Sequence, residues 1–303
     1  MAFRLRSKPS ATEARAQDSQ KNLSRPSAQE IFEQVANNAR QELKRSTSAL
    51  AISGFAGGIF MGLSALGNAI TLAMLGTSSK VQFIARMFYP IGFIVVILGR
   101  AQLFTENTLY PVALVLAEKK HFWNTMRLWF TVLPANVAGA LAFAALASLT
   151  DALSPDVVQA IARLGLDAVH RDPSAVFWSG VMGGWIIALV AWLVSGSHSI
   201  TGSVMIIWIL TFVVGLGNFA HCIAASGEVL TAVLTRQIPW EMYFKWLLPA
   251  VGGNICGGVG MVTLLEYGQV VYGDVGETAA QKDSAAPADS SDAGAGKAEQ
   301  NVA

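Results

Sequence analysis

The sequence predicts an all-α membrane protein that crosses the bilayer six times. Of its 303 residues, 53% are hydrophobic and 14% are charged, and its mean hydropathy is +0.46. This is too little charge for a soluble domain of this size. Six apolar stretches reach about the 20 residues that a helix needs to cross the hydrocarbon core. They cover residues 48–75, 83–117, 125–149, 175–195, 200–235 and 242–270. The second and the fifth are too long and too polar at their centres for one straight helix, so both are predicted to be broken.

The chain divides into four parts. Residues 1–26 are polar and basic and predict a disordered cytoplasmic N-terminus. Residues 27–47 predict an amphipathic cytoplasmic helix that begins with a capping box at Ser27. Its apolar face can pack on the protein or on lipid. Residues 48–272 predict the six-helix transmembrane domain, and residues 273–303, rich in Ala, Asp, Ser and Gly, predict a disordered cytoplasmic tail.

Lysine and arginine set the predicted orientation of the spans. Nine precede the first span, and Lys119, Lys120 and Arg127 flank the connection between spans two and three. Because basic residues stay on the cytoplasmic side, both termini are placed there. The acidic loop between spans three and four then faces outward.

The composition also excludes several classes of function. A net charge of +1 gives no reason to expect a nucleic-acid partner. The four histidines have no metal-ligand spacing. The sequence contains neither a nucleophile–base pair nor a phosphate-binding loop. No metal, no cofactor and no enzymatic activity are therefore predicted.

The two halves of the membrane domain resemble each other. Leu103 precedes Asn136 by 33 residues, and His221 precedes Asn254 by 33 residues as well (136 − 103 and 254 − 221). A Gly-Gly pair lies in span one and another in span four. Because each half has three spans, an odd number, the halves must enter the membrane from opposite sides, which predicts a 3+3 inverted repeat with its site near the midplane. The alternative is that glycine pairs recur only because small residues let helices pack closely.

The two interrupted spans carry the polar residues. Thr105 is predicted to cap the half-helix after the first interruption, and Ser226 the half-helix after the second. Irregular backbone at this depth requires cover by protein or water. Each restarted helix points its positive end toward the membrane centre, which favours an anion.

His221 lies inside the second interruption and is the strongest candidate for function. An ionisable side chain at bilayer depth is costly unless it faces a cavity or a partner, so its position suggests a pore. The alternative is a buried histidine that bonds a backbone carbonyl between helices. Arg100 and Glu106 flank the first interruption and form a candidate charge pair. They either hold that loop together, or leave Arg100 free to attract anions.

Four elements carry a resemblance to a known family. They are Leu103-Phe104-Thr105, the motif ending in Phe219-x-His221, Asn136-x-x-Gly139-Ala140, and Leu248-Pro249 with Gly253-Asn254-Ile255-Cys256-Gly257-Gly258. Over residues 45–270 the chain resembles the formate/nitrite transporter family. The Leu-Phe-Thr-Glu-Asn-Thr string from residue 103 resembles a divergent branch of it. The resemblance implies an aquaporin-like protomer with an inverted repeat, assembled as a homopentamer in which each protomer has its own pore.

The resemblance also implies roles for individual residues. The pore and proton-relay residues correspond to His221, Thr105 and Asn254. The inner constriction corresponds to Leu103, Phe104 and Ile187, and the outer constriction to Tyr89, Phe93 and Val214.

Three positions depart from the family pattern. Ala220 replaces a glutamate that often precedes the histidine. Gly184 stands where span four often has an asparagine. The vestibule lysine has no clear match, and His170 and Arg171 are the nearest basic residues.

The implied function is transport of a small monovalent anion or its weak acid, such as formate or nitrite, across a bacterial inner membrane. The anion loses its water between the two constrictions and takes a proton near His221. Two alternatives stay open. One is a channel for a small neutral solute, although Pro134-Ala135-Asn136 runs opposite to the Asn-Pro-Ala motif of aquaporins. The other is a membrane scaffold or sensor that transports nothing.

Overall fold

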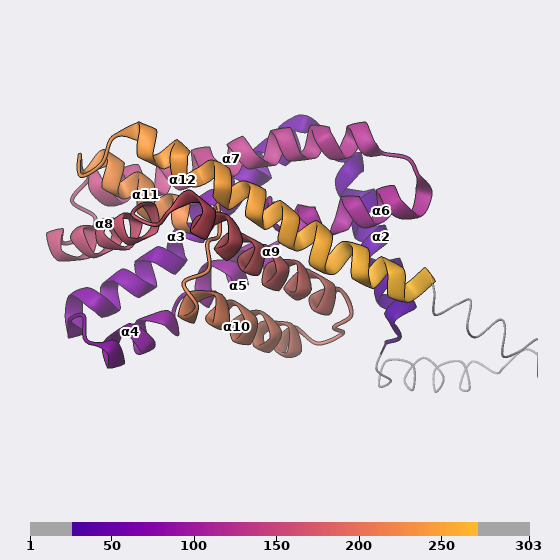
Figure 1. The fold of residues 1–303 in the computed structure, drawn as a ribbon, viewed down its shortest axis with the longest axis horizontal. Helices are drawn as coiled ribbons and strands as arrows, with labels where there is room; N and C mark the ends of the chain where they lie inside the picture. The colour runs from indigo at the N-terminus through magenta and orange to yellow at the C-terminus, as the bar shows by residue number, and fades with distance from the viewer. Residues whose placement is uncertain (1–25, 272–303) are drawn as a thin grey trace, which may run out of the picture.

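The helices of this protein run side by side along one long axis, and the two ends of the described chain emerge together at one end of the molecule (Figure 1). The computed structural model describes residues 26–271. The two predicted disordered tails lie outside these residues, apart from residue 26.

The predicted apolar stretches correspond to helices, and the second and fifth stretches are each broken in two. In the first half these helices are α3 (Thr47–Leu75), α4 (Ser79–Arg86), α5 (Pro90–Leu98), α6 (Tyr110–Glu118) and α7 (Phe122–Ser148). In the second half they are α9 (Pro173–Ser195), α10 (Ile200–Leu216), α11 (Ala224–Leu234) and α12 (Trp240–Ile255), which continues through a π-helical segment, η2 (Cys256–Thr263).

Within the described residues, five helical segments are long and apolar enough to cross a membrane. They are Thr47–Leu75, Ser79–Leu98, Phe122–Ser148, Pro173–Ser195 and Trp240–Val271. Helices α10 and α11 are apolar but shorter, because residues 217–223 interrupt them. The chain is therefore a multi-pass membrane protein with interrupted helices at the two predicted places.

One helix departs from the sequence-based expectation of an acidic loop between spans three and four. Helix α8 (Pro155–Val169) fills much of that connection and packs against α11 and α3. Pro155 occupies its first turn together with Asp156, both favourable at a helix N-terminus. Val157, Ile161 and Leu164 recur at helical spacing and are buried. These signals were present in the sequence, but the four aspartates of the segment obscured them.

The amphipathic N-terminal helix, α2 (Ala28–Lys44), packs on the protein itself. Ser27 caps it, and the Ser27 and Glu30 side chains form the predicted capping box. Its buried residues, Val35, Ala36, Ala39 and Leu43, lie among apolar side chains of the membrane domain. The apolar face is therefore covered by protein rather than left free for lipid.

Close glycine contacts join α3 to α7 and α9 to α12. A Cβ atom on Gly58 would overlap the Asn136 carbonyl, and one on Gly184 would overlap the Asn254 carbonyl. Small residues at such points let helix backbones approach closely in membranes. Both Gly-Gly pairs thus serve helix contact, and each contact falls beside an asparagine of the neighbouring helix.

We predict that Gly184→Ala lowers the thermal unfolding midpoint in detergent, at a cost of about 1–3 kcal/mol, because the added methyl group meets backbone that cannot move aside. Gly260→Ala is the matched control, since a Cβ atom there meets nothing within 4 Å. Equal midpoints for the two variants would contradict the prediction.

Candidate functional site

Two irregular loops interrupt the helices, and the helix before each loop ends with the same backbone geometry. Gly99 and Arg100 follow α5, and Gly217 and Asn218 follow α10. Arg100 and Asn218 both adopt left-handed backbone, with φ of 57° and 48°. In each case the next amide bonds back to the last turn, from Ala101 to the Val96 carbonyl and from Phe219 to the Val214 carbonyl. These are two Schellman-type helix ends.

Asn136 of α7 holds the first loop. Its amide nitrogen donates to the carbonyls of Gly54 (2.7 Å) and Gln102 (2.8 Å), and its Oδ1 accepts from the Phe104 amide at 2.9 Å. The Gln102 amide also donates to Ser53 Oγ of α3 at 3.1 Å. A buried side chain thus supplies the partners that the broken helix has lost.

Asn254 of α12 holds the second loop with the same set of contacts. Its amide nitrogen donates to the carbonyls of Gly180 and Ala220, both at 2.8 Å, and its Oδ1 accepts from the Cys222 amide at 2.9 Å. Ser179 Oγ of α9 accepts from the Ala220 amide at 3.0 Å, as Ser53 does in the first loop. Asn254 therefore positions the loop that carries His221, and its hydrogen bonds go to backbone.

The two loops meet at one hydrogen bond. Thr105 Oγ1 and His221 Nε2 are 2.8 Å apart, and both side chains are fully buried. The other ring nitrogen, Nδ1, accepts from the amides of Ile223 (3.3 Å) and Ala224 (3.0 Å), at the start of α11. Since Nδ1 is an acceptor, a neutral ring carries its proton on Nε2 and donates it toward Thr105.

The predicted helix caps are wrong at both interruptions. Thr105 makes no capping bond to the short helix η1 (Glu106–Thr108), because its hydroxyl contacts His221. Ser226 lies inside α11, where its hydroxyl contacts the Cys222 carbonyl and Tyr243. The first amides of α11 are satisfied by His221 itself. The positive end of this helix is therefore occupied by an imidazole nitrogen.

Apolar side chains enclose the Thr105–His221 pair. All six residues assigned to the two constrictions are buried and belong to the main core, namely Leu103, Phe104, Ile187, Tyr89, Phe93 and Val214. Phe93 lies edge-on to the His221 ring, with centroids 5.0 Å apart, and Tyr89 packs on Phe93. Phe104 packs edge-on to Trp129, a contact that the sequence did not suggest.

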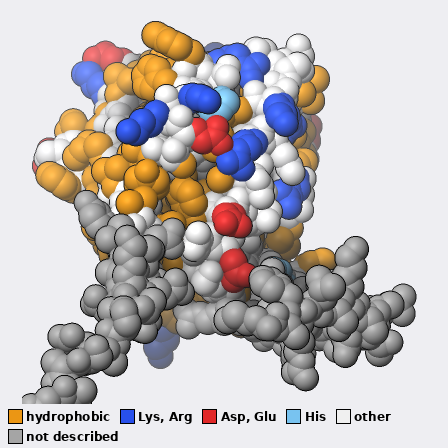
Figure 2. All heavy atoms as spheres, turned by 90° about the vertical axis from the view of Figure 1, so that its right-hand side faces the viewer, with side chains coloured by type: hydrophobic (Ala, Val, Ile, Leu, Met, Phe, Trp, Pro, Cys, Tyr) orange, Lys and Arg blue, Asp and Glu red, His pale blue; other side chains and the backbone are white. Residues whose placement is uncertain are grey.

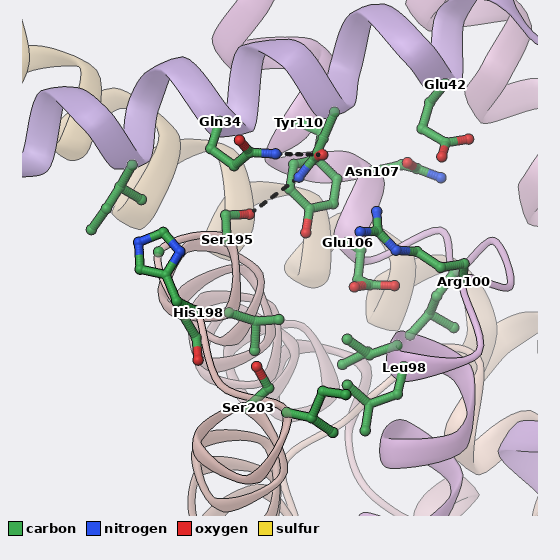
Figure 3. A pocket seen from close by; sticks show the side chains of 18 of the residues that line it. Gln34, Glu42, Leu98, Arg100, Glu106, Asn107, Tyr110, Ser195, His198 and Ser203 are labelled. Atoms are coloured by element: carbon green, nitrogen blue, oxygen red, sulfur yellow. Dashed lines mark hydrogen bonds between the residues drawn. The ribbon is translucent and has the colours of Figure 1, made fainter. Parts of the chain in front are cut away.

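A large cavity with a mixed polar and apolar lining approaches this region from the end where α2 lies. It measures ≈ 670 Å³ and reaches Leu103. Arg100 and Glu106 both project into it (Figure 3), and among the described residues no ion pair within 4 Å joins them. Tyr110 and His198 also line the cavity (Figure 3).

A much smaller hollow, ≈ 30 Å³, reaches the outer residues Tyr89 and Val214. Arg171, one of the two basic candidates for this vestibule, lines it and donates to the Asn218 carbonyl at 2.9 Å. Arg86 and Glu228 line it too, and the sequence gave no signal that brought these two together. The buried apolar segment with Thr105 and His221 thus lies between an inner cavity and an outer hollow.

Known proteins resemble this chain in sequence and in fold. A family model described as formate/nitrite transporter matches residues 29–268. The chain belongs to the formate/nitrite transporter family. It is 30% identical over 247 residues to the inner membrane protein YfdC of Escherichia coli, covering 80% of this chain and 79% of that protein. It is 23% identical to the formate channel BtFdhC of Bacillus thuringiensis, covering 77% and 92% of the two chains.

Solved structures share the fold. A chain described as an FNT family ion channel superposes with a TM-score of 0.70 at 18% identity, covering 77% of this chain and 96% of that one. A pentameric formate channel with formate bound gives 0.62 at 18% identity, covering 75% and 97%.

The structure explains one departure from the formate/nitrite transporter pattern. A side chain at Gly184 would overlap the Asn254 carbonyl, so the asparagine expected there does not fit. The other departure, Ala220, contributes its carbonyl to the Asn254 contacts, and its methyl group is buried.

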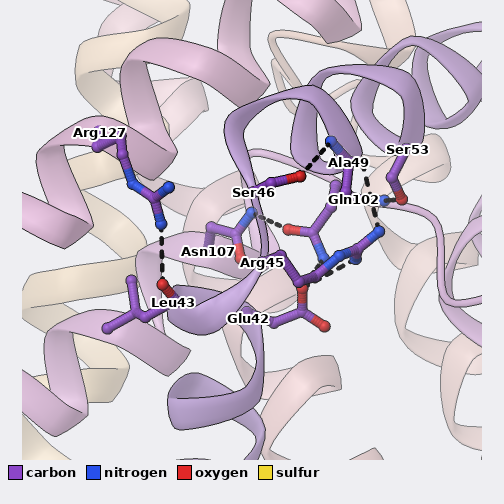
Figure 4. A network of polar contacts seen from close by, with 9 residues as sticks. All are labelled: Glu42, Leu43, Arg45, Ser46, Ala49, Ser53, Gln102, Asn107 and Arg127. Atoms are coloured by element: carbon purple, nitrogen blue, oxygen red, sulfur yellow. Dashed lines mark hydrogen bonds and ion pairs between the residues drawn. The ribbon is translucent and has the colours of Figure 1, made fainter.

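A second polar network ties α2 to the first loop of this transporter (Figure 4). Gln102 Nε2 donates to Glu42 at 2.6 Å, and Asn107 Nδ2 donates to Gln102 Oε1 at 2.9 Å. Arg45 holds the same Glu42 carboxylate at 2.9 Å. The sequence analysis missed this network because Glu42 and Gln102 are 60 residues apart and share no motif.

The end of the molecule near α2 and α6 is rich in basic side chains, with a few acids and a histidine among them (Figure 2). There Arg40 of α2 donates to Glu118 of α6 at 2.6 Å, and His121 contacts the same carboxylate at 3.1 Å. This ion pair adds a second attachment between α2 and the membrane domain.

We predict that Asn254→Ala lowers stability by at least about 2 kcal/mol, because it leaves two carbonyls and one amide of buried backbone without partners. Thermal unfolding of the purified protein in detergent measures this loss. Asn124→Ala is the control, since Asn124 is exposed and should change stability by less than about 0.5 kcal/mol. An Asn254→Ala variant as stable as this control would contradict the role given to Asn254.

Proposed function

We propose that this protein is a channel or transporter for small monovalent anions or their weak acids, such as formate or nitrite. The observation that carries the proposal is the Thr105–His221 contact, buried between two hollows on opposite sides of an apolar segment. The name of the relative from Bacillus thuringiensis, a formate channel, supports the substrate class.

The proposed architecture is six spans arranged as a 3+3 inverted repeat. Helix α3, the broken α4–α6 and α7 make the first half, and α9, the broken α10–α11 and α12 make the second. Three matched sets of contacts support it: the two Schellman-type ends, Ser53 with Ser179, and Asn136 with Asn254. Contacts this specific are not explained by glycine packing alone.

The proposed orientation places both termini in the cytoplasm of a bacterium whose inner membrane holds the protein. Both described ends lie at the same end of the molecule (Figure 1), as an even number of spans requires. Basic side chains gather at that end (Figure 2), as on the cytoplasmic side of membrane proteins. The inner membrane name of the Escherichia coli relative supports the location.

A homopentamer is the proposed assembly, with one pore in each protomer. The solved pentameric formate channel supports it at the level of the fold. Large apolar side chains are exposed on the isolated protomer, among them Met74, Phe130, Ile200 and Leu248 at 70–78%. Lipid tails and neighbouring protomers would cover such surfaces.

Transport is proposed to depend on protonation of the anion. An anion that enters the apolar segment loses its water, and burying a bare charge costs several kcal/mol or more. Desolvation raises the pKa of the anion itself, so that a proton from water converts it to a neutral acid. His221 Nε2–H and the Thr105 hydroxyl then offer hydrogen bonds that replace part of the lost hydration.

We predict that His221→Phe slows formate uptake into proteoliposomes by at least about tenfold and changes its pH dependence. The phenyl ring keeps a planar aromatic side chain, although a slightly larger one, and removes both the hydrogen bond to Thr105 and the acceptor for the α11 amides. His121→Asn is the control, because His121 lies at a helix start with φ of 68°, a backbone that asparagine tolerates.

An unchanged rate and pH profile in His221→Phe would refute the role of the histidine. Osmotic swelling without formate flux in the wild-type protein would instead support the neutral-solute channel. If the wild-type protein carries neither formate nor a neutral solute, the scaffold or sensor function would be supported instead.

A further inference from the structure

One buried acidic side chain in the inner cavity has no role in the mechanism described so far. Glu106 follows Thr105 directly and is 7% exposed. Its carboxylate projects into the inner cavity (Figure 3), whose lining includes Leu103 of the inner constriction. Across residues 26–271, this carboxylate takes part in no hydrogen bond or ion pair. Because the carboxyl group faces the cavity and is held by no protein partner, it is free to interact with water or a solute there.

Charged or titratable groups from several elements line the same cavity as Glu106. Arg100 comes from the same loop, Glu30 and Glu42 from α2, Tyr110 from α6 and His198 from the connection before α10. Glu42 is committed to Arg45 and Gln102. Among residues 26–271, Arg100 is the only arginine that lines the cavity, and its side chain points toward Glu106 (Figure 3).

Arg100 occupies a backbone position that disfavours it. Its φ of 57° is left-handed, where a side chain other than glycine or asparagine costs about 1 kcal/mol. The matched position of the second loop holds Asn218, which tolerates this conformation. Lys119 and Arg236 adopt the same conformation elsewhere, so what distinguishes Arg100 is that it lines the cavity beside Glu106.

We propose that Glu106 is the inner proton-exchange group of the pore, and that it shares a proton with the incoming weak-acid anion beside Arg100. This inference rests on the proposed function and specifies where its proton comes from. When two carboxylates come into contact, their repulsion keeps both from being ionised, so the pair holds one proton. An anion therefore enters the inner constriction together with a proton.

The exchange needs no further reactant. The O–H bond of the protonated Glu106 carboxyl breaks, and the proton forms a new O–H bond on the anion. The neutral acid passes Leu103, while Arg100 balances the charge left on Glu106. Water in the cavity then returns a proton to Glu106. Inward transport uses the same steps in reverse.

The test is radiolabelled formate flux in proteoliposomes between about pH 5 and about pH 8, with the assembled full-length protein. Glu106→Gln is expected to slow uptake about tenfold near neutral pH, with a smaller loss in acid, where formic acid is itself more abundant. The control, Glu33→Gln, removes an exposed carboxylate from the same end of the molecule and should match wild type. An assembled Glu106→Gln protein with the wild-type rate and pH profile would overturn the inference.

Arg100→Asn provides an independent second variant, because Asn218 shows that asparagine fits this backbone. We expect its pH profile to move, since Glu106 loses the charge that balances it. A uniform loss of rate at every pH, or no loss, would overturn the inference, because it would mean that Arg100 only attracts anions or does nothing. Absence of any weak-acid flux in wild type would instead refute the proposed function itself.

Discussion

The structure depends on how backbone is satisfied where two helices break inside a membrane protein. Water is scarce at that depth, so each unpaired amide or carbonyl costs several kcal/mol. Two asparagines on unbroken helices meet this constraint. Asn136 and Asn254 each pair two carbonyls and one amide of a loop and its neighbouring helix. Because the loops are held in this way, Thr105 and His221 can meet at 2.8 Å.

The same constraint decides what His221 can do. The start of α11 offers two free amides, which could have bound an anion. The ring accepts both of them through Nδ1 and is left with Nε2–H as its donor. The imidazole thus completes the helix end and at the same time presents one hydrogen bond to the other loop. The two amide contacts to Nδ1 therefore account for both the buried position of the ring and its orientation.

The two halves share backbone contacts but differ in the charges that they present. Among the described residues, the inner cavity carries Glu30, Glu42 and Glu106 with Arg100, whereas the outer hollow carries Arg86 and Arg171 with Glu228. At the matched left-handed positions the inner loop has Arg100 and the outer loop has Asn218. The two loops thus have similar backbone contacts, while the hollows beside them carry different charged side chains.

Much of the fold could be predicted from the sequence, because the free energy of moving a segment into lipid depends on that segment alone. Hydropathy located the apolar stretches, and the polar centres of two of them located both breaks. Helix α8 was missed because its aspartates outweighed its apolar spacing. The caps predicted at Thr105 and Ser226 were wrong, because each hydroxyl has a tertiary partner that local spacing cannot reveal.

The sequence by itself determined the membrane class of the protein, the places where its helices break and the residues that stand at those breaks. Only the tertiary structure decided which of them touch. Thr105 and His221 are 116 residues apart, and Glu42 and Gln102 are 60 apart. Glu106 shares a cavity with Arg100 without contacting it. Such contacts depend on how whole helices pack against one another, and no property of a short stretch of chain encodes that packing.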